Sequence, residues 1–230
     1  MIELRLLDGF EVWRDGDVVA LPQSARRLAA FLALHERPLH RIYVSGSLWL
    51  ESTEENANAS LRSTLWRLGR QDCPLIDSSG SLVRLAPEVA VDLHDARERA
   101  RAVLRGEGAT PLGLDLLCRA GELLPHWYDD WVVIERERFR QLRLHALDAL
   151  CESLAAAGRY AAAVEAGRAS VAGEPLRESA HRLLIQAYLA EGDRGEATRQ
   201  YRAFRDLLQD ELGLAPSPQL EELVAPLPVW

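Results

Sequence analysis

The 230-residue sequence contains no lysine, so all 27 of its Lys and Arg side chains are arginine. This absence excludes a P-loop lysine, a Schiff-base lysine, a pyridoxal-phosphate anchor and a lysine general base. Catalytic patterns that need no lysine are missing too, since there is no G-x-S-x-G motif and no Cys/His arrangement above chance. The sequence therefore favours a protein that is not an enzyme, and it predicts no cofactor.

Cysteine and long apolar runs are also scarce. The three cysteines form neither a C-x-x-C pair nor a zinc spacing, which predicts no metal and a reduced, cytoplasmic compartment. His35 and His40 are five residues apart rather than four, with Pro38 between them, which excludes a zinc-protease helix. No signal peptide is evident, and no stretch approaches the ~18 uninterrupted apolar residues of a membrane span. We therefore expect no membrane association.

The charge is distributed unevenly along the chain. The formal net charge is −8, yet residues 1–90 carry 10 Arg against 12 acidic residues, whereas residues 91–230 carry 17 against 23. Between Asn56 and Gln71 there are three Arg and no acidic residue. Because a local field rather than the total charge attracts an anion, the negative sum does not exclude a basic patch in the first part of the chain.

The first 88 residues have the order of elements found in a winged helix-turn-helix. Residues 2–21 alternate in hydropathy around two Asp-Gly pairs, which predicts a small antiparallel meander. Apolar residues then recur at helical spacing in three segments, residues 23–37, 40–50 and 56–71. A hairpin with a Ser/Gly tip is expected at 75–85. Ser52 and Glu55 have capping-box spacing for the third helix.

The remainder of the chain reads as helical, beginning near Asp92. The segment from Ala156 to Ala163 recurs at 190–197, an offset of 34 residues, which is the tetratricopeptide period. Helices fit residues 92–105, 112–123 and 132–157, with three more up to 212. We therefore predict two domains: an α+β winged helix-turn-helix with an N-terminal antiparallel sheet (1–88), and an all-α, tetratricopeptide-like domain (92–230).

The third expected helix has one apolar and one polar face. At ~100° per residue, four apolar residues fall on one stripe, namely Ala57, Leu61, Leu65 and Leu68. The opposite face carries Arg62, Ser63, Trp66, Arg67 and Arg70. Two interpretations stay open, a solvated helix surface or a DNA contact, because the planar guanidinium suits either phosphate or guanine. Trp66 either covers the hairpin or touches a phosphate or a thymine methyl group.

An aromatic connector precedes the long helix near residue 132. Trp127, Tyr128 and Trp131 fit core packing between the two halves, with an exposed anchor for a protein partner as the alternative. The following segment, ERERFRQLR at 135–143, fits a solvated helical face with i,i+4 ion pairs.

Three long stretches resemble one known family. They are SLWLESTEENANASLRSTLWRLGRQ, LLPHWYDDWVVIERERFRQLRLHALDAL and EPLRESAHRLLIQAYLAEGDRGEATRQYRAFRDLLQDELGLAPSPQL. All three resemble the SARP-type bacterial transcriptional activators, in which a winged helix-turn-helix precedes a bacterial transcriptional activation domain. The resemblance implies that the protein binds direct repeats in double-stranded promoter DNA as a homodimer and recruits RNA polymerase. It also implies that the genes controlled belong to a secondary-metabolite cluster, such as an antibiotic pathway.

The resemblance also implies roles for particular residues. The third helix would enter the major groove through Arg62, Ser63, Trp66, Arg67 and Arg70, and the wing would reach DNA through Ser79 and Arg84. The loop between the second and third helices would touch polymerase through Glu51, Glu54 and Glu55. Asn56 and Gly69 stand where the family carries Arg, and each lost phosphate contact lowers the salt slope by ~0.9. A protein-interaction adaptor without DNA binding is therefore the alternative.

Overall fold

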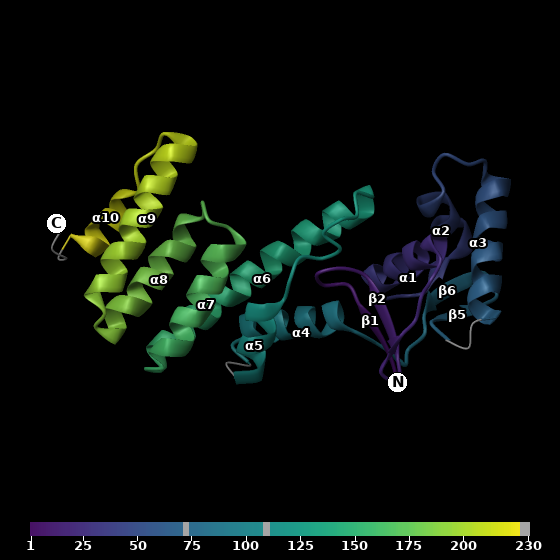
Figure 1. Cartoon of the computed structure of the whole chain (residues 1–230), viewed down its shortest axis with the longest axis horizontal. Coiled ribbons are helices and arrows are strands. Elements are labelled where there is room, and N and C mark those ends of the chain that lie inside the picture. Colours follow the sequence, from purple (N-terminus) through teal and green to yellow (C-terminus); the bar gives the residue numbers. More distant parts are fainter. Residues whose placement is uncertain (71–73, 108–110, 226–230) are drawn as a thin grey trace. The chain divides into compact units, whose positions relative to one another are not determined.

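The computed structural model describes residues 1–70, 74–107 and 111–225 (Figure 1). The chain forms two compact units. The first consists of Met1–Asp95 and Gly121–Arg138, and the second of Ala96–Ala120 and the chain from Phe139 onward. The domain ranges 1–88 and 92–230 stay a prediction, since residues 121–138 belong to the first compact unit although they lie in the second predicted range.

The first unit begins with the expected meander. Strands β1 (Ile2–Arg5), β2 (Glu11–Arg14) and β3 (Asp17–Val18) pair antiparallel, with the buried residues Leu4 and Val12 opposite each other. A fourth strand, β7 (Val89–Val91), adds in parallel to β1 and gives the sheet order β3-β2-β1-β7. The sheet is therefore mixed rather than purely antiparallel. The sequence did not predict the parallel strand, because a parallel pair joins distant segments and leaves no turn signal.

A winged helix-turn-helix follows the meander. Its elements are α1 (Gln23–His35), β4 (Leu39–His40), α2 (Arg41–Leu48), α3 (Glu54–Arg70), β5 (Ile76–Ser79) and β6 (Leu82–Leu85). The predicted hairpin is β5–β6, and β4 extends it to three strands in the order β4-β6-β5. Phe31, Leu61 and Val83 share one buried core, so the wing packs beneath α1 and α3. Helix α3 begins before the predicted residue 56, and its N-terminal cap is Thr53, which accepts a hydrogen bond from the Asn56 N–H at 3.4 Å.

The segment after Gly121 pairs with the turn between β1 and β2. The Asp8 N–H donates to Glu122 O at 2.8 Å, and the Leu124 N–H donates to Leu6 O at 2.9 Å. The aromatic connector continues this packing: Trp127 stacks on Phe10, and Trp131 meets Phe31 edge-on. The prediction of core packing is therefore confirmed for Trp127 and Trp131, which pack within the first unit. The third, Tyr128, is 80% exposed.

The second unit is helical. Two helices begin in the first unit and continue into the second, α4 (Asp92–Leu104) and α6 (Asp130–Ala156). The others are α5 (Pro111–Arg119), α7 (Tyr160–Gly173), α8 (Glu178–Glu191), α9 (Arg194–Leu212) and α10 (Pro218–Val224).

The 34-residue repeat corresponds to a structural repeat. Gly158 and Gly192 follow helices α6 and α8 with φ of 70° and 92°, a left-handed conformation that glycine adopts without strain. Ala163 and Ala197, which also differ by 34, are fully buried on the next helix of each pair. The tetratricopeptide-like prediction is confirmed. The sequence did not predict α10, which has only seven residues.

Candidate nucleic-acid interface

Helix α3 is anchored along its apolar face. Leu61 and Leu68 are buried in the core shared by α1, α2 and the wing, and Thr64 is also buried. The Ser45 hydroxyl of α2 donates to Asn58 Oδ1 of α3 at 2.8 Å, which fixes the two helices to each other. Because these contacts occupy one side of α3, the opposite side is directed outward.

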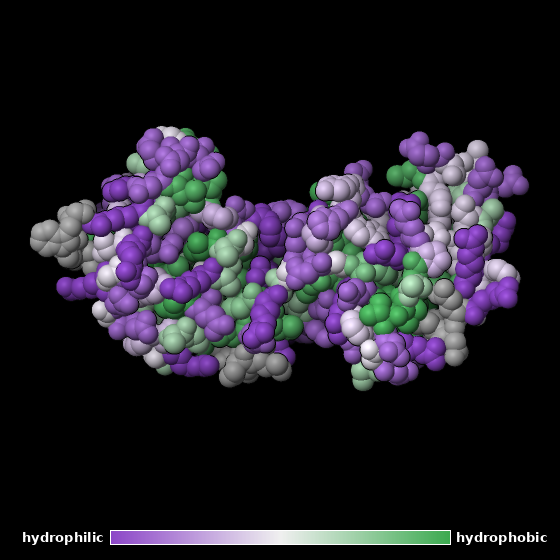
Figure 2. Space-filling model, viewed as in Figure 1, coloured by the Kyte–Doolittle hydropathy of each residue, from purple (hydrophilic) through white to green (hydrophobic). Residues whose placement is uncertain are grey.

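The outward side carries the five residues predicted for DNA contact. All five are exposed, and at ~100° per residue they span an arc of about 140°. Arg62 lies at one edge of this arc and Arg67 at the other, with Ser63, Trp66 and Arg70 between them. Figure 2 shows hydrophilic side chains along α3. We call this arc the α3 face.

The described residues offer no carboxylate partner to the positive charges of the α3 face. Among the described residues, neither Arg62 nor Arg67 has an ion-pair partner. The Arg70 guanidinium stacks over the Trp66 ring, 4.8 Å from its centroid, and Trp66 remains 61% exposed. The indole is therefore a surface group, and the three guanidinium groups have no carboxylate partner within residues 1–70, 74–107 and 111–225.

The wing contributes less charge than the sequence suggests. Arg84 lies opposite Asp77 in the β5–β6 register, and their Nη2 and Oδ2 atoms are 2.7 Å apart. Both side chains are roughly half exposed, so the charge of Arg84 is offset at the surface. Ser79 is exposed at the end of β5, beside the turn. The structure therefore leaves a polar wing tip with a neutralised arginine behind it.

Arg41, for which sequence patterns predicted no role, links α2 to the wing. Its guanidinium donates to Ser78 Oγ at 2.5 Å, and its backbone N–H donates to Ser81 O at 2.8 Å. Arg41 also lines a hollow of about 290 Å³ together with Asn58, Arg62 and Ser81. The start of α2, the α3 face and the wing turn thus meet there. The only sequence signal is one basic residue at the start of a short helix.

The acidic residues predicted to contact polymerase do not all lie in a loop. Glu54 and Glu55 form the first turn of α3, where negative charge stabilises the helix N-terminus. Only Glu51 lies in the connection between α2 and α3. All three side chains are exposed.

Other chemistry has little support in the part of the chain that the structure describes. No three His, Cys, Asp or Glu side chains of residues 1–70, 74–107 and 111–225 are grouped to hold a metal. Burial raises the pKa of the Cys118 thiol to about 11 and that of Cys151 to about 12, so both stay protonated at neutral pH. Cys73 lies outside the described residues. No helix in these ranges combines the length and hydropathy needed to cross a bilayer.

Comparison with known proteins gives consistent matches. The model of the bacterial transcriptional activator domain matches residues 113–227, half of the chain. The regulatory protein AfsR of Streptomyces coelicolor is 34% identical over 230 residues, which cover 95% of this chain and 23% of AfsR. The transcriptional regulator RedD of the same organism is 29% identical over 165 residues, which cover 70% of this chain and 42% of RedD. The chain thus spans about a quarter of AfsR and less than half of RedD.

A solved structure supports the fold. Mycobacterium tuberculosis EmbR, in complex with a low-affinity phosphopeptide, aligns with a TM-score of 0.67 and 24% sequence identity. The alignment covers 96% of this chain and 63% of EmbR. The predicted fold class, a small N-terminal sheet and winged helix followed by a helical part, is confirmed.

Proposed function

Because this chain belongs to the SARP-type bacterial transcriptional activators, we propose that it binds promoter DNA sequence-specifically and activates transcription by recruiting RNA polymerase. The observation that carries the proposal is the α3 face, where three guanidinium groups that have no carboxylate partner in the described part of the chain stand beside an exposed indole. The family resemblance supports promoters of a secondary-metabolite cluster as the targets.

The proposed docking places α3 in the major groove. The groove is about 12 Å wide and admits a helix of about 10–12 Å diameter. With Arg62 and Arg67 at opposite edges of the α3 face, their guanidinium groups would approach the two groove walls, while Ser63, Trp66 and Arg70 face the base edges. Ser79 would reach the backbone beside the groove, and Arg41 joins this surface through its contacts with the wing.

The proposed assembly on DNA is a homodimer on direct repeats. Two copies in the same orientation would place their α3 helices about 10–10.5 base pairs apart, or a multiple of this spacing. Such a head-to-tail contact buries different surfaces on the two copies, so the free protein need not be a dimer. A binding stoichiometry of two per tandem site and one per single site is the expected result.

The proposed polymerase contact uses Glu51, Glu54 and Glu55. A variant with all three changed to Gln should retain DNA affinity and lose activation in a reconstituted transcription assay. Removing the two helix-terminal carboxylates costs about 0.3–1 kcal/mol each, so folding of the variant must be confirmed first. Unchanged activation by a folded variant would refute this contact.

The experiment that tests DNA binding starts from selection of bound duplexes out of random double-stranded oligonucleotides. The selected duplex and a scrambled one are then titrated by fluorescence anisotropy at several salt concentrations. We expect preference for the selected duplex and a steep loss of affinity as salt rises. An adaptor would instead enrich no duplex, show no salt-sensitive DNA retention, and capture a protein partner through residues 92–230.

A further inference from the structure

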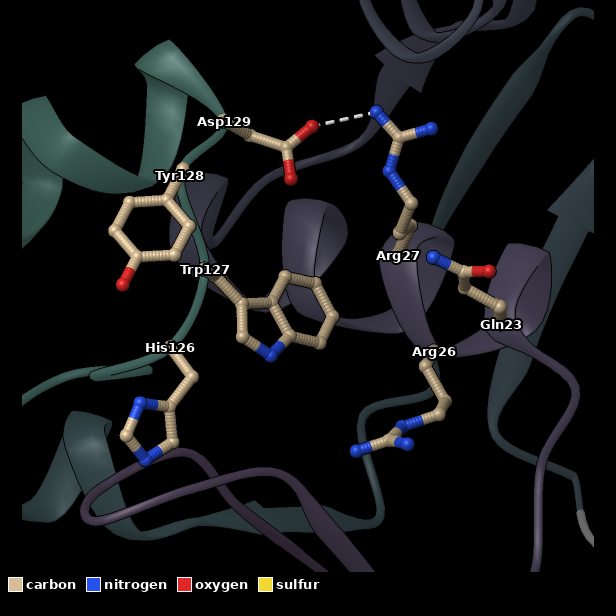
Figure 3. Close-up of a pocket in the computed structure, with 7 residues that line it drawn as sticks. All are labelled: Gln23, Arg26, Arg27, His126, Trp127, Tyr128 and Asp129. Atoms are coloured by element: carbon tan, nitrogen blue, oxygen red, sulfur yellow. Dashed lines mark hydrogen bonds and ion pairs between the residues drawn. The ribbon is translucent and has the colours of Figure 1, made fainter.

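A pocket of about 530 Å³ lies within the first unit (Figure 3). One wall is the first turns of α1, and the other is the segment His126–Asp129 that leads into α6. The described residues that line it are Gln23, Arg26, Arg27, His126, Trp127, Tyr128 and Asp129. Its volume falls within the range of about 300–1,000 Å³ that is typical of small-molecule sites.

The walls of the pocket are held in place by a contact between them and by contacts with residues outside the pocket. Arg27 donates through Nη2 to Asp129 Oδ1 at 2.5 Å and through Nη1 to Leu48 O at 3.0 Å. Trp127 stacks on Phe10 with ring centroids 5.7 Å apart. Since both walls are fixed without a ligand, binding requires little ordering of the protein.

The pocket offers more hydrogen-bond donors than acceptors. Asp129 is the one carboxylate among the described lining residues, and Arg27 already pairs with it. Arg26 has no carboxylate partner in the described chain; its guanidinium lies 5.0 Å from the Phe10 ring centroid and makes a 3.4 Å contact with Phe10 O. His126 and the Trp127 indole N–H also lack hydrogen-bond partners among the described residues. This excess of donors favours an acceptor-rich, negatively charged ligand.

Two of the free donors converge. Figure 3 shows the Arg26 guanidinium and the indole nitrogen of Trp127 directed toward one part of the pocket, with the His126 ring beside it and the Tyr128 ring beyond Trp127. One inorganic oxyanion would leave most of 530 Å³ unfilled, and the remaining space borders the aromatic rings. We propose that this pocket binds a small organic anion, a flat aromatic skeleton bearing a carboxylate or phosphate group, with Arg26 as its charged anchor.

The test uses the full chain without DNA, so its result does not depend on the proposed DNA binding. Phenyl phosphate and benzoate are the probes, and inorganic phosphate and phenol are the matched controls that lack one half of the proposed ligand. The readout is the indole N–H resonance of Trp127 in ¹H–¹⁵N spectra, assigned with Trp127→Phe. We expect a saturable shift with at least one probe, and weaker shifts with both controls. The probe that binds more tightly identifies the anionic group.

Variants separate a specific site from general attraction. Arg26→Gln should weaken probe binding at least about tenfold, as expected for loss of a charge-assisted hydrogen bond. Arg119→Gln, which removes an exposed arginine of the second unit, should leave it unchanged. Because Arg26 also contacts Phe10, His126→Ala serves as a second variant, at an exposed residue that makes no side-chain hydrogen bond or ion pair within the described residues. A several-fold loss is expected. Absence of a saturable shift with both probes, or equal affinity of the two pocket variants and wild type, would overturn the proposal.

Discussion

Arg136 should be one of the most sensitive positions for stability in the first unit. Its Nε donates to Leu123 O at 2.7 Å, and its Nη2 donates to Trp127 O at 2.8 Å and also to Leu124 O. Glu122 lies 3.2 Å from Nε. These bonds surround Leu124, which has φ of 44°, a left-handed conformation that costs a non-glycine residue roughly 1–2 kcal/mol. One guanidinium thus holds a strained turn that leads into the pocket wall.

The expected cost of Arg136→Met follows from these contacts. A hydrogen bond to a charged group contributes about 1.5–3 kcal/mol in full burial. Since 17% of the Arg136 side chain is exposed, water replaces part of each bond, and we take about 1 kcal/mol for each of the three, or about 3 kcal/mol together. Methionine retains the packing of the aliphatic stem. At about 2–4 °C per kcal/mol for a chain of this size, the melting temperature should fall by about 6–12 °C.

Scanning calorimetry and urea unfolding measure this loss. The matched control is Arg138→Met on the same helix, because Arg138 is 70% exposed and its ion-pair partner among the described residues is Glu135 at i,i+3. The control should stay within about 0.5 kcal/mol of wild type. If Arg136→Met is also within that range, the three carbonyl contacts do not stabilise the connector and the reasoning is refuted.

Three further predictions concern stability. Gly69→Ala should raise the free energy of unfolding, measured by urea denaturation, by about 0.5–1 kcal/mol, since Gly69 lies in α3 with open space around a Cβ atom. A decrease would show that the glycine is needed. Gly192→Ala, at φ of 92°, should lower stability by roughly 1 kcal/mol in the same assay, and no change would argue against the left-handed cap. Burial lowers the pKa of His181, so the unfolded chain binds more protons and stability should fall as pH drops below about 6.5. His181→Phe should reduce this dependence in unfolding curves at pH 7 and 5; an unchanged curve would exclude His181 as its source.

Local patterns in the sequence predicted most of the first unit. The meander, three helices and hairpin each depend on residues within a few positions of one another, such as Asp15-Gly16 between β2 and β3. The sequence did not predict β7 or β4, because their partners, β1 and β6, lie far along the chain. The packing of residues 121–138 against the β1–β2 turn was missed for the same reason.

The candidate interface was likewise predictable only where its residues lie close together in the sequence. Helical periodicity placed Arg62 and Arg67 on one face because both lie on a single helix. Periodicity says nothing about cross-strand partners, so the neutralisation of Arg84 by Asp77 was not foreseen. The pocket was out of reach of sequence patterns, since Arg26 and His126 are a hundred residues apart and no motif relates them.

We propose that the α3 face binds DNA through arginine charges that no carboxylate of the described residues pairs. The measurement that tests it most directly is the salt dependence of binding to the selected duplex by wild type, Arg67→Ala and the control Arg119→Ala, followed by anisotropy. We predict weaker binding by Arg67→Ala, with the slope of log K against log salt reduced by about 0.9, and no change for Arg119→Ala. Arg67→Ala binding with the wild-type affinity and slope at every salt concentration would contradict the account.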